Sequence, residues 1–214
     1  MQRVLILVLT CLASPALAHH PLAGAPLTSF RDGILSGIGH PILGFDHLFF
    51  VLAIGLAARF SGRGLTGPMV YVAAMLAGCW ALYAGVTIPA HEAMIVASLV
   101  VVGGFIASGR AMGRWGVIVL FGGFGLFHGA GLGTTIAGQE GAIGGDVLTG
   151  YLIGLAVVQY LIAVLFGTVG AWVIGAKGAG SIPSRLMGSA ICGAGVFMAL
   201  EMAEGPIVTM LTRI

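Results

Sequence analysis

The chain has 214 residues, of which 58% are hydrophobic and 7% charged, and its mean hydropathy is +1.09. A soluble domain carries about 25% charged residues, so this composition excludes an ordinary water-soluble protein and predicts an all-α protein embedded in a lipid bilayer. The net charge of +2 is spread over single basic residues and offers no surface for nucleic acid, and three cysteines are a poor basis for a disulfide framework.

The first 18 residues have the pattern of a cleaved signal peptide. Arg3 supplies the basic start, a short apolar run follows, and Ala-Leu-Ala at residues 16–18 forms a cleavage site. Cleavage would leave one transmembrane domain, residues 19–214, that begins with His19 and His20. The two imidazoles and the new α-amine could collect a metal ion outside the membrane, although the same residues also fit an ordinary cleavage context.

Six apolar segments follow, each long enough to cross a bilayer. They are residues 37–58, 67–88, 90–108, 115–137, 147–174 and 186–211. The connecting segments are short and rich in Gly, Pro or Ser, so no domain outside the membrane has room to fold. The expected architecture is therefore a bundle of six transmembrane helices.

Charge is divided unequally between the connecting segments. Those after the first, third and fifth spans contain six of the nine Lys and Arg residues and no acid: Arg59, Arg63, Arg110, Arg114, Lys177 and Arg185. Around the breaks after the second and fourth spans lie acidic residues and histidine but no Lys or Arg: His91 and Glu92 at the very start of the third span, then Glu140 and Asp146. The positive-inside rule places the basic segments in the cytoplasm and both termini in the periplasm of a bacterial inner-membrane protein.

Glycine is abundant, with 37 residues, and is concentrated in the fourth apolar segment. Small residues let membrane helices approach closely, so close packing at the centre of the bundle is the first interpretation. A flexible or broken helix beside a binding site is the second, and the two are compatible.

The first apolar segment carries the most unusual polar cluster, the sequence Gly-His-Pro-Ile-Leu-Gly-Phe-Asp-His at residues 39–47. A continuous helix would place His40 and His47 on one face about two turns apart, and Pro41 and Gly44 can open the helix locally. Two imidazoles with the Asp46 carboxylate suit nickel, cobalt, zinc or copper(II) better than calcium or magnesium. The alternative is a His–Asp hydrogen bond that only joins helices.

Further candidates lie in the other spans. They are His91 and Glu92 in the third, His128 in the fourth, Gln159 in the fifth, and Glu201 and Glu204 in the sixth. We expect Glu92 and His128 to be buried and Gln159 to bridge two helices, whereas His91 and Glu204 also fit solvated positions at the membrane surface. Helical rise places four ionisable groups in the periplasmic half of the membrane, which predicts a common site: Asp46, Glu92, His128 and Glu201.

The motif Gly-His-Pro-x-x-Gly-x-Asp-His resembles the signature of the HupE/UreJ family of nickel and cobalt permeases. The likeness extends to the chain length, the six spans, Glu92 followed by Ser98, and the Phe-His-Gly of residues 127–129. It implies secondary uptake of nickel or cobalt, with no permanently bound cofactor and a link to hydrogenase or urease maturation. It also implies a set of functional residues: His40, Asp46 and His47 first, then His128 and Glu92. A histidine expected near residue 159 is replaced by glutamine.

The leading hypothesis is therefore import of a divalent metal ion from the periplasm by a protein that is not an enzyme. The sequence has no Gly-x-x-x-x-Gly-Lys loop, which argues against direct use of ATP. Two alternatives are an intramembrane metal-dependent hydrolase and a membrane subunit that holds haem through histidines. The first lacks both a His-Glu-x-x-His motif and a Gly-x-Ser-x-Gly elbow.

Overall fold

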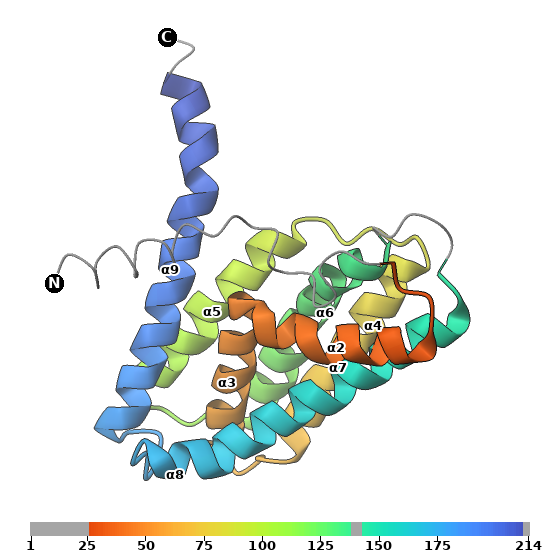
Figure 1. The fold of residues 1–214 in the computed structure, drawn as a ribbon. Coiled ribbons are helices and arrows are strands. Elements are labelled where there is room, and N and C mark those ends of the chain that lie inside the picture. Colours follow the sequence, from red (N-terminus) through yellow and green to blue (C-terminus); the bar gives the residue numbers. More distant parts are fainter. Residues whose placement is uncertain (1–25, 138–142, 212–214) are drawn as a thin grey trace, which may run out of the picture.

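The computed structural model describes residues 26–137 and 143–211, and all regular secondary structure in these ranges is helical (Figure 1). The helices are α2 (Phe30–Leu43), α3 (Phe45–Phe60), α4 (Thr66–Tyr83), α5 (His91–Ala107), α6 (Arg114–Ala137), α7 (Gly145–Leu165), a π-helical turn η2 (Phe166–Gly170), α8 (Ala171–Val173) and α9 (Ile182–Leu211). The predicted signal peptide, His19, His20 and Glu140 lie outside the described residues.

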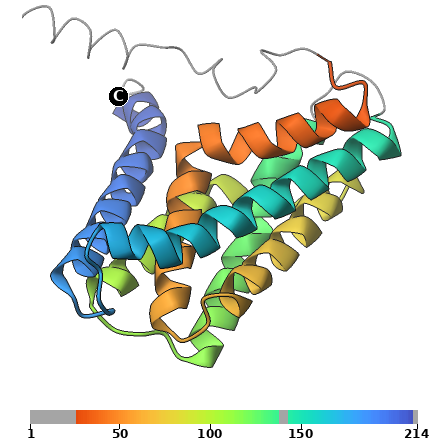
Figure 2. The same ribbon diagram turned by 60° about the horizontal axis from the view of Figure 1, so that its bottom comes forward.

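The first predicted span is not a single helix. α2 and α3 meet at Gly44 with a bend of 81°, so the expectation of one continuous helix over residues 37–58 is wrong. Gly44 has extended backbone angles (φ −82°, ψ 101°), ends α2 and begins α3. The local opening that Pro41 and Gly44 predicted is confirmed, with Pro41 inside the last turn of α2. The bend turns α2 so that it lies along α7 (Figures 1 and 2).

The other predicted spans correspond to helices with shifted ends. α4 stops at Tyr83, earlier than predicted, and Gly85 follows with a positive φ of 83°. α9 starts at Ile182, four residues early, because Pro183 fits the first turn of a helix. By length and composition, α4, α6, α9 and the helix from α7 through α8 can each cross a membrane, and the bent α2–α3 pair can form a fifth span. The chain is therefore a multi-pass membrane protein.

Closely packed helix pairs build the bundle, and glycines mark where their backbones meet. α6 packs parallel to α4, with Gly125 beside Tyr71 and Gly129 beside Met75. α5 packs antiparallel to α9, where Gly195 lies beside Leu99. α2 packs parallel to α7 through similar glycine contacts. A Cβ on Gly129 would lie 1.9 Å from the Met75 carbonyl oxygen, so only glycine permits this approach. The close-packing interpretation of the glycines in α6 is confirmed for Gly125, Gly129 and Gly133, whereas a Cβ on Gly123 would meet no atom within 4 Å.

The connecting segments sort to two ends of the bundle. At one end the Met112 amide donates to Ser61 Oγ at 3.1 Å, and Arg185 Nε donates to the Ala107 carbonyl at 3.0 Å. These contacts join the three segments that carry the basic residues, and we call this end the basic end. At the other end, the Tyr83 hydroxyl donates to the Ile143 carbonyl at 3.3 Å and joins the segments after α4 and α6.

Candidate metal site

The break at Gly44 positions the histidines and the aspartate of the first motif. A straight helix would separate residues seven apart by about 10 Å along its axis, but the bend brings the ring centroids of His40 and His47 to 6.0 Å. His47 Nε2 lies 3.9 Å from Asp46 Oδ2. The tertiary bend, rather than helical periodicity, therefore brings these three side chains together.

A cavity of about 340 Å³ adjoins this cluster, between α2, α3, α5 and α6. Its lining residues are His40, Gly44, Asp46, His47, His91, Glu92, Ile95, Gly131 and Thr134. A neighbouring hollow of about 290 Å³ is lined by Asp46, Glu92 and Glu201 together with apolar residues of α5 and α9. Of the four groups predicted to share a site, Asp46, Glu92 and Glu201 line these adjoining hollows, whereas His128 lines neither.

His128 lies behind His47, away from any solvent, and both of its ring nitrogens have protein partners. His128 Nδ1 is 2.8 Å from His47 Nδ1, and His128 Nε2 is 2.9 Å from Ser98 Oγ. The Ser98 hydroxyl also donates to the Ile95 carbonyl at 2.6 Å. Phe50 stacks on the imidazole, with ring centroids 4.2 Å apart and planes 9° apart. The predicted burial of His128 is confirmed, since its exposed fraction is 0%.

The remaining predicted residues lie nearer the surface. Glu92 is exposed, so its predicted burial is wrong; α5 begins only at His91 and carries Glu92 in its first turn. His91 is half-buried, with Nδ1 3.2 Å from the Ile88 carbonyl. Glu201 and Glu204 are both exposed, and Glu201 lines the hollow beside Asp46.

Gln159 joins two helices as predicted. Its side-chain oxygen accepts a short hydrogen bond from the Tyr71 hydroxyl, which connects α7 to α4, and both side chains are fully buried. Within the described part of the chain, Gln159 Nε2 has no hydrogen-bond partner. Tyr71 also lies edge-on to His128, with centroids 6.2 Å apart, so this bridge adjoins the histidine pair.

The side chains are near one another without forming a complete ligand shell. In residues 26–137 and 143–211, no group of three or more His, Cys, Asp or Glu side chains is positioned to hold a metal ion. His47 is almost fully buried, whereas the Asp46 side chain is 26% exposed. Assembly of three ligands would therefore need the half-buried side chains of Asp46 and His40 to rotate toward His47.

Comparison with known proteins assigns the family. The model of the family described as HupE / UreJ protein matches residues 7–198, most of the chain. The chain belongs to the HupE/UreJ family. Members of this family are nickel/cobalt transport-related proteins. Protein HupE of Rhizobium leguminosarum bv. viciae is 27% identical over 189 residues, which cover 87% of this chain and 92% of that protein. No solved structure matches the chain.

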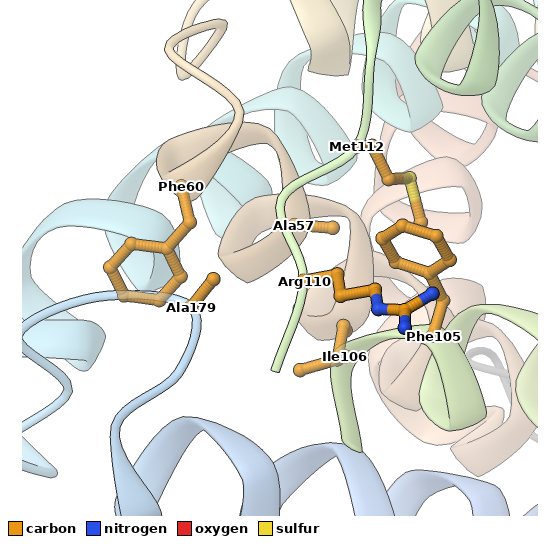
Figure 3. Close-up of a pocket in the computed structure, with 7 residues that line it drawn as sticks. All are labelled: Ala57, Phe60, Phe105, Ile106, Arg110, Met112 and Ala179. Carbon is orange, nitrogen blue, oxygen red and sulfur yellow. The ribbon is translucent and has the colours of Figure 1, made fainter. Parts of the chain in front are cut away.

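One small hollow lies at the basic end of this HupE/UreJ protein. The hollow there has a volume of about 10 Å³, close to the least space that holds one water molecule. Figure 3 shows its lining, in which Arg110, Phe105 and Met112 lie on one side, Phe60 and Ala179 on the other, and Ala57 between them. The cavity at His47 is far larger than the hollow at this end.

Proposed function

We propose that this protein is a secondary transporter that imports a divalent transition-metal ion, nickel or cobalt, from the periplasm into the cytoplasm. Membership of the HupE/UreJ family supports transport of such an ion rather than an enzymatic role. The observation that carries the proposal is the convergence of His40, Asp46 and His47 on one cavity. A set of imidazole and carboxylate ligands suits nickel and cobalt.

The proposed topology is six spans in the bacterial inner membrane after removal of residues 1–18. Sorting of the connecting segments to two ends supports it, because successive spans must alternate in direction. The parallel α4–α6 pair and the antiparallel α5–α9 pair fit the same alternation. α5 has 17 residues, which is at the lower limit of about 17–25 for a transmembrane helix. The positive-inside rule then assigns the basic end to the cytoplasm.

In this orientation the cavity at His47 faces the periplasm and the basic end faces the cytoplasm. The ion would enter past Glu92 and His91, whose side chains line the cavity. His40 and Asp46 would rotate toward His47 as they replace part of the ion's water shell. The membrane potential favours inward movement by about 2.3 kcal/mol per charge per 100 mV, or roughly twice that for a divalent ion.

The proposed role in the cell follows from the family. HupE/UreJ proteins relate to the nickel handling of hydrogenases and ureases, so the imported ion would supply the maturation of such an enzyme. The ion is the transported substrate, and the proposal requires no resident cofactor. His19 and His20 would collect the ion at the mature N-terminus.

Uptake of radioactive nickel, and separately of cobalt, tests the proposal in cells that express the chain. His47→Ala and Asp46→Asn should each lower uptake at least tenfold at equal membrane abundance, because each removes one proposed ligand. Asp146→Asn is the matched control, since Asp146 is an exposed carboxylate in the first turn of α7. Absence of uptake of either ion by the unaltered chain would refute the proposal. Uptake that survives both ligand substitutions would refute the site.

A further inference from the structure

A chain of hydrogen bonds runs from α5 through α6 to His47 in α3. Its members are the Ile95 carbonyl, the Ser98 hydroxyl, the imidazole of His128 and the imidazole of His47. Ser98 and His128 have an exposed fraction of 0%, and that of His47 is 5%. No water can therefore replace a protein partner along most of this series of hydrogen bonds. Each hydrogen-bonding proton in the series must be assigned to one of the side-chain atoms.

The protons can be assigned from the carbonyl outward. A carbonyl only accepts, so the single hydroxyl proton of Ser98 goes to Ile95. Ser98 Oγ then accepts, and His128 Nε2 must donate to it. A neutral His128 with its proton on Nε2 has an acceptor at Nδ1, so His47 Nδ1 carries the proton of the 2.8 Å contact. In a neutral His47 the unprotonated nitrogen is therefore Nε2, the atom on the Asp46 side of the ring.

We propose that Ser98 and His128 are positioning residues that hold His47 in the tautomer whose Nε2 binds the transported ion. This inference rests on the proposed function. A histidine that ligates a metal usually donates its other N–H to a protein acceptor, which fixes both the tautomer and the ring direction. Phe50, stacked at 4.2 Å, holds the ring of His128 in the orientation that both hydrogen bonds require.

The proposal separates His128 from the direct ligands. Both ring nitrogens of His128 form hydrogen bonds, one with His47 and one with Ser98. His128 therefore has no lone pair available for an ion while these two hydrogen bonds are present. The acceptor behind His47 is a neutral imidazole, whereas a carboxylate there would add negative charge and raise the basicity of the ligand. A neutral partner suits an ion that must leave the site as well as enter it.

The experiment titrates Ni²⁺ and Co²⁺ into the purified full chain and counts imidazole ligands on bound Co²⁺ by X-ray absorption. Ser98→Ala should weaken binding by up to about tenfold, at the low end of the range of about 10–100-fold seen when the direct partner of a ligating histidine is removed, because Ser98 acts on His47 through His128. The control is Ser108→Ala, because Ser108, which caps the C-terminal end of α5, makes the same hydroxyl-to-carbonyl bond, to Phe105, without contacting a histidine. The control should bind as the unaltered chain does.

Substitution at His128 gives the second measurement. Asn places a side-chain oxygen near the position of His128 Nδ1, so His128→Asn should keep the bond to His47 and bind more tightly than His128→Ala. Both variants should keep the imidazole count of the unaltered chain. In the metal-free protein, ¹⁵N NMR should show the His47 proton on Nδ1, and Ser98→Ala should reduce the population of that tautomer. A proton on His47 Nε2 would overturn the proposal.

Two other results would overturn the proposal while leaving the transport function intact. One is loss of an imidazole from bound Co²⁺ in His128→Asn, which would make His128 a direct ligand. The other is unchanged affinity in Ser98→Ala. Failure of the unaltered chain to bind either ion would instead refute the proposed site together with this inference.

Discussion

Replacing Gly129 by alanine should destabilise the bundle where α6 meets α4. The new Cβ would lie 1.9 Å from the Met75 carbonyl oxygen and 2.9 Å from the Cys79 amide nitrogen. Real Cβ contacts are essentially never shorter than 3.0 Å, so the two backbones must separate by about 1 Å, and overpacking of this kind costs about 1–3 kcal/mol. Both atoms belong to the backbone, so no side-chain rotation can relieve the contact.

The matched control is Gly123→Ala in the same helix, where a new Cβ has no atom within 4 Å. Any gain in helix propensity is common to both variants, so their difference isolates the contact with α4. The measurement is the midpoint of thermal unfolding of each purified protein in the same detergent, with Ni²⁺ affinity as a second readout. His128 adjoins Gly129, so separation of the helices should also weaken the bond from His47 to His128 and the binding of the ion. Equal midpoints for the two variants would refute this account of the α4–α6 contact.

Two further predictions concern the residues around the histidine pair. Tyr71→Phe leaves the buried oxygen of Gln159 without its donor and should lower the free energy of unfolding by about 1–3 kcal/mol. Tyr83→Phe removes a more exposed hydrogen bond of 3.3 Å and should have little effect. Equal stability of the two variants would show that the buried bridge contributes nothing. Gly131→Val should reduce metal uptake severely, because even a Cβ at this position would lie 2.7 Å from Ile95 Cδ1 and 3.5 Å from His47 Cε1. Gly123→Val is the control and should keep normal uptake. If Gly131→Val also keeps normal uptake, the cavity is not the route of the ion.

The sequence determined the class of this protein and indicated the residue types of its candidate site. Hydropathy and charge are local properties, so they were enough to predict a helical membrane protein and to place five of the six predicted segments on helices whose ends differ by a few residues. The motif at residues 39–47 indicated the family, and the match over residues 7–198 confirms it. Helical rise also placed Asp46, Glu92, His128 and Glu201 at similar depth, because that estimate needs only the distance along each helix.

Only the tertiary structure decided how these residues meet. Glycine and proline showed that the first span could open, but the 81° bend depends on α2 packing against α7, more than 100 residues later in the chain. The hydrogen bonds of His128 join residues separated by 81 and 30 positions, which no local pattern encodes. In the sequence, Ser98 contributes only to the likeness to the HupE/UreJ family. Its contact with His128, and hence its place behind His47, arises only when α3, α5 and α6 are packed together.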